Sequence, residues 1–320
     1  MLVNALENTI ATLIDQEGLP KSYANTVQQI IVPLVHYVSQ LHKSAQRTLV
    51  VGIHGAQGTG KSTLALFMRE LLSKHWSCPT ASFSLDDIYL TRAERRELAE
   101  QVHPLLLTRG VPGTHDIELG QRVIDQLRSA QPGDETAIPA FDKSIDDRAP
   151  ADDWPVFKGR PAVILLEGWC VGAPAQSTEA LIAPVNLLEA QEDTEGVWRD
   201  YVNQCLSTTY KEFFSQLDSL IMLKAPSMES VLEWRTLQEN KLAERIRTAA
   251  VSADKSRPLR VMSSDEVARF IMHYERITRA SLAEMPARAD VVIDVSESHS
   301  LSFKVEPPIH MGYPDKRRDS

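Results

Sequence analysis

Cysteine is scarce in this sequence, and long apolar runs are missing. The 320 residues include three cysteines, Cys78, Cys170 and Cys205, which are too far apart for a CxxC zinc site or a disulfide framework. This usage fits a reducing compartment, so the sequence predicts a cytoplasmic protein. No stretch approaches the roughly 18 apolar residues that a membrane span needs, and residues 1–16 lack the basic and apolar regions of a signal peptide.

An excess of positive charge is lacking too. Lysine and arginine number 34 against 43 aspartates and glutamates, which gives a formal net charge of −9. Proteins that coat nucleic acids are strongly basic, so we expect no nucleic-acid partner and, without an apolar span, no membrane partner. Hydrophobic residues at 43% and charged residues at 24% are ordinary globular values, which exclude extensive disorder.

Predicted strands alternate with predicted helices through most of the chain. Short apolar runs rich in β-branched residues predict the strands, and apolar residues at helical spacing lie between them. This alternation is typical of an α/β fold with right-handed crossovers, so we predict a five-stranded, mainly parallel sheet flanked by helices. The expected strands are Thr48–His54, Pro79–Leu85, Ala162–Leu166, Ser219–Leu223 and Asp290–Val295.

Three segments are expected along the chain. Residues 1–47 carry apolar residues at helical spacing and predict a helical extension that packs against the main domain. Residues 48–305 predict that main domain, and residues 306–320 predict a polar tail. Residues 131–161 are rich in Pro, Asp and Gly without periodicity, which indicates a long loop of the kind that often carries function.

The strongest motif follows the first predicted strand. Residues 55–62 (GAQGTGKS) match the P-loop pattern GxxxxGK[ST] in full, and an amphipathic helix follows them. Glycines let backbone N–H groups surround a phosphate, Lys61 would reach the β- and γ-phosphates, and Ser62 would bind Mg²⁺. The alternative is a glycine turn with an incidental lysine. The expected ATP-binding residues are Gly55, Ala56, Gln57, Gly58, Thr59, Gly60, Lys61, Ser62 and Thr63.

Two acidic positions follow later strands. Asp86 and Asp87 come after the second strand, at the end of the sheet where ligands bind in such folds. Phosphorylation of an alcohol needs a base for the hydroxyl proton, and we assign this role to Asp86. Alternatively, both aspartates cap the following turn, and the pattern does not decide whether Asp87 shares the role of base.

Glu167 closes the apolar strand Ala162–Leu166, as in a Walker B motif. It would hold the Mg²⁺ shell through water or support the base; the alternative is a carboxylate at the strand end that points to solvent. Asp86, Lys61 and Glu167 are therefore the candidate catalytic residues, and Ser62 and Glu167 the candidate metal ligands.

Basic residues on two loops could bind an anionic acceptor. Arg109 opens a rigid Gly/Pro turn (RGVPGTHD) and could clamp a carboxylate or phosphate bidentately. His115 in the same turn either binds substrate or braces the turn. Lys143 and Arg148 bring positive charge to the long loop, where a solvated charged surface is the alternative.

A basic segment follows the fourth predicted strand. A mobile lid over about residues 235–260 would exclude water and stabilise the transferring charge. Alternatively, Arg235 and Glu239 form an ordinary helical i,i+4 pair. The basic residues of the segment are Arg235, Lys241, Arg245, Arg247, Lys255, Arg257 and Arg260, and no motif singles out one of them.

Taken together, these motifs resemble the D-glycerate 3-kinase family and its bacterial and fungal kinase-like relatives. The likeness runs from about Val50 to Val295, through the ordered segments SLDDIY, RGVPGTHD, FDKSIDDR, LLEGW and WRTLQENKL. More distantly, the chain is similar to phosphoribulokinase, uridine kinase and pantothenate kinase.

The resemblance implies a P-loop kinase fold over residues 48–305, with ATP and Mg²⁺ as cofactors. It implies transfer of the γ-phosphoryl group to a small anionic alcohol, with D-glycerate as the best-known acceptor. It supports Asp86 as the base, Glu167 near Mg²⁺, and an acceptor site at Arg109, His115, Lys143 and Arg148. The alternatives are a kinase of another acceptor (a nucleoside, pantothenate or a sugar acid) and an ATPase switch without an acceptor. The oligomeric state stays open.

Overall fold

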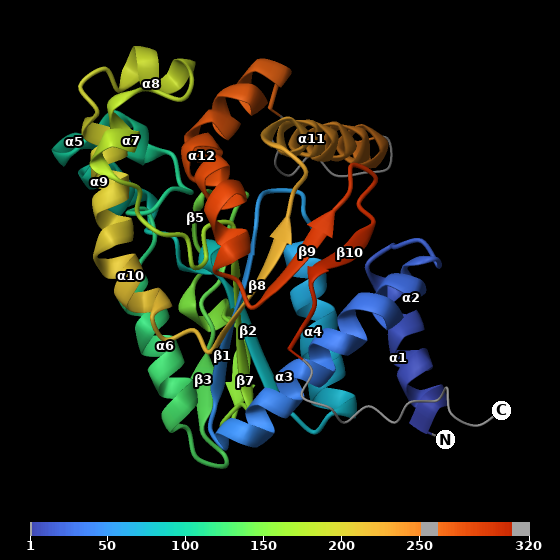
Figure 1. Cartoon of the computed structure of the whole chain (residues 1–320). Coiled ribbons are helices and arrows are strands. Elements are labelled where there is room, and N and C mark those ends of the chain that lie inside the picture. The colour runs from blue at the N-terminus through green and yellow to red at the C-terminus, as the bar shows by residue number, and fades with distance from the viewer. Residues whose placement is uncertain (1, 251–261, 309–320) are drawn as a thin grey trace.

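A six-stranded sheet forms the centre of the computed structural model, which describes residues 2–250 and 262–308 (Figure 1). The strand order is β10-β9-β8-β1-β7-β2, and all neighbours are parallel except β9 and β10. The strands are β1 Leu49–Gly55, β2 Thr80–Ser84, β7 Val163–Gly168, β8 Ser219–Lys224, β9 Val291–Val295 and β10 Leu301–Val305.

The sheet confirms the α/β, mainly parallel fold class, with one correction. We predicted five strands, and the structure has a sixth, β10, which pairs antiparallel with β9 at the edge of the sheet. Leu301–Val305 lacks the continuous apolar run by which we predicted the other strands. It alternates apolar and polar residues instead, which is the pattern of a half-exposed edge strand. By contrast, β1 and β7 are buried along their whole length, which explains their apolar sequences.

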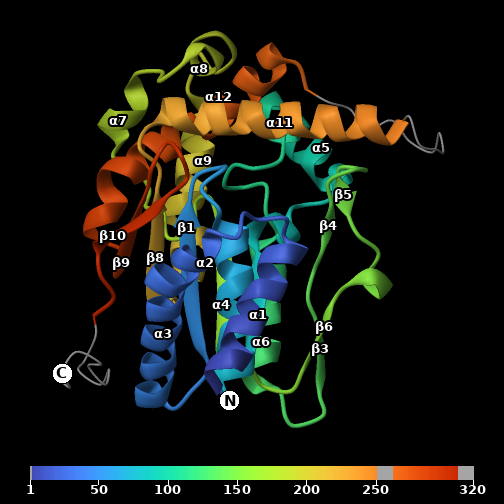
Figure 2. The ribbon, with the colours of Figure 1, turned by 90° about the vertical axis from the view of Figure 1, so that its right-hand side faces the viewer.

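Helices cover both faces of the sheet (Figures 1 and 2). On one face, Ile10, Leu34 and Phe67 from α1, α3 and α4 share an apolar cluster with the sheet, so the N-terminal helices contribute to the main core. On the other face, α6, α9 and α10 pack through a second cluster. The helices are α1 Leu2–Gln16, α2 Tyr23–Thr26, α3 Val32–Ala45, α4 Lys61–His75, α5 Arg92–Gln101, α6 Ile117–Ser129, α7 Thr178–Ile182, α8 Leu187–Glu192, α9 Val197–Ser207, α10 Thr209–Phe214, α11 Met228–Ala250 and α12 Ser264–Glu284.

The segment 131–161 contains more order than we predicted. Two short antiparallel pairs form within it, β3 (Glu135–Ala137) with β6 (Val156–Lys158) and β4 (Phe141–Asp142) with β5 (Asp147–Arg148). Strands of two or three residues are too short to show a periodic pattern in a sequence. The β4–β5 hairpin carries Lys143 and Arg148 and lies beside the site described below.

Helix α11 lies across the end of the sheet where β1 ends (Figure 2). The first part of the predicted lid, 235–260, belongs to this helix. Residues 251–261, which include Lys255, Arg257 and Arg260, lie outside the described residues. The side chains of Arg245 and Arg247 lie outside them too. Most of the predicted tail, 309–320, lies outside them too. Among the helices that the structure describes, none has the length and apolar content needed to cross a bilayer.

Candidate active site

The P-loop joins the end of β1 to the start of α4, as the motif predicts. Gly58 and Gly60 have φ angles of 82° and 89°, in the left-handed region that glycine adopts without strain. A Cβ on Gly58 would lie 2.7 Å from the Cβ of Trp234, so a larger residue would not fit there. The Thr59 hydroxyl donates to the carbonyl of Ala56 at 2.8 Å, which stabilises the turn. The first turn of α4 has no side-chain cap, which leaves its N–H groups for an anion.

A cavity of about 320 Å³ lies beside the P-loop, between the turn after β2, the β4–β5 hairpin, α11 and α12. Because the carboxyl ends of parallel strands share one edge of the sheet, residues that follow β1, β2 and β7 meet here. The predicted site residues that line it are Gln57, Gly58, Lys61, Ser62, Asp86, Arg109, Lys143 and Glu167.

Asp86 lies on a single 3₁₀ turn, Leu85–Ile88, directly after β2. Its Oδ2 accepts from Lys143 Nζ at 2.5 Å, and its Oδ1 accepts from the Tyr89 hydroxyl at 2.7 Å. Burial raises the pKa of Asp86, but the positive charge of Lys143 and these two hydrogen bonds outweigh it, so the net pKa lies below the usual value. Asp86 is therefore an ionised carboxylate held inside the cavity.

Asp87, the neighbouring carboxylate, has a different task. Its Oδ2 accepts from the backbone N–H of Ser84 at 2.8 Å, and the Ser84 side chain caps the same turn in return. Asp87 does not line the cavity. Burial, with a smaller contribution from the negative charges of Asp86 and Glu167, raises the pKa of Asp87 to about 6. The geometry thus separates a capping aspartate from one that faces the cavity.

Glu167 lies near the end of β7 and faces the start of α4. Its Oε1 accepts from the Ser62 hydroxyl at 2.9 Å, which joins the two residues predicted as metal ligands. Both supply oxygen atoms, the donors that Mg²⁺ prefers. In the described residues no group of three or more His, Cys, Asp or Glu side chains could hold a metal. A magnesium site completed by nucleotide phosphates and water needs only one or two protein ligands, so Ser62 and Glu167 fit it.

Lys61 points its ammonium group back toward the loop. Its Nζ donates to the carbonyl of Ala56 at 3.1 Å. Burial lowers the pKa of Lys61, while the negative charges of Glu167 and Asp86 act in the opposite direction. A half-buried ammonium group with two carboxylates nearby can move to a phosphate with little further loss of hydration.

Arg109 reaches the cavity from the turn that follows the 3₁₀ helix Pro104–Leu107. Its guanidinium group forms an ion pair with Asp146 and lies 5.5 Å from the centre of the Phe141 ring. The next residue, Gly110, has a φ of 136°, and a Cβ there would lie 2.0 Å from the Tyr274 hydroxyl. Only glycine fits this position, so the turn and α12 are packed tightly behind Arg109.

His115 and Arg148 do not line the cavity. The buried His115 ring stacks on Tyr89 with centroids 4.7 Å apart and shares a 2.6 Å hydrogen bond with the hydroxyl of Tyr210. The guanidinium group of Arg148 donates to the Tyr89 carbonyl at 3.0 Å and to Asp116 at 3.2 Å. Of the two roles that the sequence left open for His115, this placement favours bracing, and Arg148 likewise supports the Tyr89 backbone.

The burial of His115 predicts a pH dependence of stability. Burial lowers the pKa of His115 to about 4, whereas an unfolded histidine titrates near 6.5. Between these values the unfolded chain binds the extra proton, so acid destabilises the fold. From pH 7 to pH 4.5, the free energy of unfolding should fall by on the order of 2 kcal/mol more in the wild type than in His115→Gln, measured by urea denaturation. Parallel pH profiles of the two proteins would contradict this.

Several cavity residues had no role in the sequence-based prediction. Aromatic side chains dominate them: the indole N–H of Trp169 donates to the Gly110 carbonyl at 2.8 Å, and its ring packs edge-on against Tyr274. Tyr89, Gly168, Trp169 and Gln238 lie inside the SLDDIY, LLEGW and WRTLQENKL segments, which is the signal that could have found these four. The residues missed are Tyr89, Gly168, Trp169, Gln238, Phe270 and Tyr274.

Arg235 also lines the cavity, from the first half of α11. It pairs with Glu239 at 2.5 Å and lies over the Phe270 ring at 5.5 Å. The i,i+4 pair that the sequence offered as an alternative therefore exists, but it is largely buried against the cavity rather than on the surface. Glu239 also accepts from the backbone N–H of Met262 at 3.3 Å, which ties α11 to the start of α12.

Several known proteins are similar to this chain. Residues 21–277 match the family model described as KAP family P-loop domain. The uncharacterized kinase mug58 of Schizosaccharomyces pombe is 32% identical over 261 residues, which cover 78% of this chain and 87% of that protein. The chloroplastic D-glycerate 3-kinase of Arabidopsis thaliana is 28% identical over 263 residues, 79% of this chain and 53% of that protein.

A solved structure shares the fold. D-glycerate 3-kinase from Cryptococcus neoformans superposes with a TM-score of 0.68 at 23% sequence identity, over 85% of this chain and 97% of that one. At this identity the likeness concerns the fold alone. The family match and the relatives place the chain among P-loop kinases, which use ATP with a divalent metal. The chain therefore belongs to the P-loop kinase family that includes D-glycerate 3-kinase, and it is an ATP-dependent phosphotransferase.

Proposed function

We propose that this protein transfers the γ-phosphoryl group of ATP to a hydroxyl group of a small anionic alcohol, with D-glycerate, converted to 3-phosphoglycerate, as the first candidate. One observation carries the proposal: the carboxylate of Asp86 lies in the P-loop cavity with the ammonium group of Lys143 at 2.5 Å from it. A base and a cation at this spacing suit a substrate that has a hydroxyl and a carboxylate close together. The names of the relatives favour D-glycerate among such substrates.

The P-loop half of the site would hold the nucleotide. Backbone N–H groups of the loop and of the first turn of α4 would bind the phosphates, and Lys61 would turn from the Ala56 carbonyl to the γ-phosphate. Ser62 and Glu167 would hold Mg²⁺, which supplies neutralisation of the charge on the β- and γ-phosphates. Positioning of the phosphoryl group and stabilisation of its charge account for most of the catalysis in such reactions.

Asp86 would accept the proton of the acceptor hydroxyl as the new P–O bond forms. In the structure, Lys143 and Tyr89 both hold its carboxylate, and Lys143 keeps its pKa low. An acceptor carboxylate offers Lys143 a second partner. When Lys143 turns to the acceptor, its positive charge lowers the pKa of Asp86 less. The effect of burial then raises the pKa of this carboxylate. Binding of an anionic acceptor would thus make the base stronger.

The acceptor would also compete for Arg109. Asp146 occupies the guanidinium group in the structure, and side-chain exposures of 26% and 36% leave this ion pair within reach of solvent. A substrate carboxylate can replace Asp146 without leaving either charge buried and unpaired, so the exchange costs little. Lys143 and Arg109 together are our candidates for the acceptor carboxylate, whereas His115 and Arg148 would position Tyr89 behind Asp86.

The test is ADP release with ATP and Mg²⁺ against a panel of acceptors. The panel contains D-glycerate, L-glycerate, other sugar acids, pantothenate, nucleosides and a blank. We expect D-glycerate to raise ADP formation far above the blank. Stimulation by a nucleoside or by pantothenate instead would support the kinase and reject the glycerate assignment. Hydrolysis that no acceptor stimulates would favour an ATPase switch and reject the proposal.

Arg109→Ala tests the acceptor site. Loss of a charge-assisted, bidentate contact should raise the KM for D-glycerate by roughly 10- to 100-fold, because hydrogen bonds to charged groups contribute about 1.5–3 kcal/mol. The KM for ATP should change by less than about threefold. Arg122→Ala, an exposed arginine of α6 outside the cavity, is the matched control and should leave both constants unchanged. Equal effects on both substrates would mean that Arg109 shapes the whole cavity instead.

A further inference from the structure

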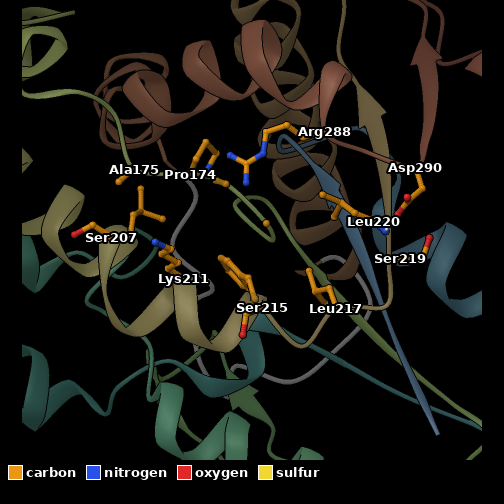
Figure 3. Close-up of a pocket in the computed structure, with 14 residues that line it drawn as sticks. Pro174, Ala175, Ser207, Lys211, Ser215, Leu217, Ser219, Leu220, Arg288 and Asp290 are labelled. Carbon is orange, nitrogen blue, oxygen red and sulfur yellow. Dashed lines mark hydrogen bonds between the residues drawn. The ribbon is translucent and has the colours of Figure 1, made fainter. Parts of the chain in front are cut away.

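A second and larger cavity lies apart from the P-loop. It measures about 590 Å³, within the range of small-molecule sites, and shares no lining residue with the active-site cavity (Figure 3). Its walls come from the loop after β7, from α10, from the start of β8 and from the turn before β9. None of the proposed chemistry uses it.

Two cationic side chains line this cavity. Lys211 comes from α10 and Arg288 from the turn before β9, and Figure 3 shows the ends of both side chains on the side of Pro174 and Ala175. Neither side chain has an ion pair or a hydrogen bond to a partner within the described part of the chain. Asp290, the acidic residue of the lining, lies at the other end beside Leu220, where its Oδ2 accepts from the Leu220 backbone N–H at 2.8 Å.

The rest of the lining is mixed, with Ser207, Ser215 and Ser219 among apolar side chains. The apolar part of the lining includes Pro174, Ala175, Phe214, Leu217 and Leu220. Two cations that lack protein partners, next to about five apolar side chains, suit a ligand with an anionic head and a hydrocarbon body. A bare inorganic anion would leave the apolar side chains unused. Both cationic side chains are exposed to solvent, so an uncharged ligand would gain no attraction from them.

We propose that this cavity is a second ligand site, specific for a small organic anion with an apolar carbon skeleton. Its position also connects it to the active site. Gly168, the last residue of β7, and Trp169, the first residue of the loop after it, line the P-loop cavity. A few residues further on, Gly172 to Ala175 line the second cavity. A ligand here would therefore contact the same loop that holds Trp169, without touching the nucleotide.

The probe for this site is 1-anilinonaphthalene-8-sulfonate. Its sulfonate suits the two cationic side chains, and its aromatic rings suit the apolar side chains of the lining. We expect saturable fluorescence enhancement with the full-length protein at pH 7. The double variant Lys211→Gln/Arg288→Gln should bind the probe at least tenfold more weakly, because it loses both charge-assisted contacts. Ala175→Trp should abolish binding by filling the cavity. The matched control, Arg122→Gln/Lys158→Gln, removes two surface charges elsewhere and should bind as the wild type does.

Competition decides the ligand class and the location. ATP with Mg²⁺ should not displace the probe; displacement would place the probe in the active site and overturn the proposal. Octanoate should displace it at concentrations where inorganic phosphate does not. If phosphate displaces the probe at the same concentration as octanoate, or if neither anion displaces it, the site does not prefer an anion with an apolar skeleton and the proposal fails. Unchanged affinity in both Lys211→Gln/Arg288→Gln and Ala175→Trp, with thermal midpoints like that of the wild type, would also reject the site.

Discussion

Lys61→Ala should reduce kcat by on the order of 10³ or more, because the change removes the charge that follows the γ-phosphate into the transition state. This corresponds to about 4 kcal/mol of lost transition-state stabilisation. The lysine is half-buried near Asp86 and Glu167, and no other residue of the P-loop carries a positive charge. Steady-state ADP release with the best acceptor measures the effect.

Lys74→Ala provides the matched control for Lys61→Ala. Lys74 lies in the last turn of the same helix, α4, and its side chain is 57% exposed, where it pairs with Glu70. Loss of such a surface pair changes stability by less than about 1 kcal/mol and should leave kcat unchanged. A Lys61→Ala enzyme with near-normal turnover would refute the assignment of the P-loop to phosphoryl transfer.

Asp86→Asn should lower kcat by on the order of 10²–10⁴ while ATP binding is kept, as expected for the loss of a general base. The asparagine preserves the size of the side chain and can still accept from Tyr89, but it cannot take a proton. Single-turnover transfer from ATP measures the chemical step, and equilibrium binding of ATP measures the rest of the site. A collapse of ATP affinity would instead make Asp86 a metal ligand or a structural residue.

Asp87→Asn is the sharpest control for Asp86→Asn, because the two aspartates are adjacent in the chain. Asparagine can still accept the hydrogen bond from the Ser84 N–H, so the cap survives. Because the Asp87 side chain does not line the cavity, kcat should stay within about threefold of the wild type, well short of a lost base. A loss of 10² or more in both variants would show that the two carboxylates act together.

The P-loop and five of the six strands of the central sheet were predictable because local sequence encodes them. Glycines at 58 and 60 adopt positive φ angles that other residues avoid, and the apolar run of β1 is needed because this strand is buried on both faces. The carboxyl-end rule for parallel sheets then predicted that Asp86 and Glu167 would lie near the phosphates, and the cavity includes both.

The acceptor side was less predictable. The sequence predicts four acceptor-binding residues on two loops. Arg109 and Lys143 line the cavity, whereas His115 and Arg148 lie behind Tyr89. Charge on a loop does not reveal which way the side chain points. The aromatic lining from α12, Phe270 and Tyr274, carried no signal at all, since an aromatic residue on an amphipathic helix indicates only a buried face.

The sequence by itself determined the fold class, the nucleotide loop and the two strand-end carboxylates, since each depends on conformational preferences within a few consecutive residues. Only the tertiary structure decided that Lys143 meets Asp86 across 57 residues of chain and that Asp146 occupies Arg109. Those outcomes depend on how the β4–β5 hairpin and α12 pack against the end of the sheet. Packing brings together side chains from distant segments, and no local pattern records which of them will touch.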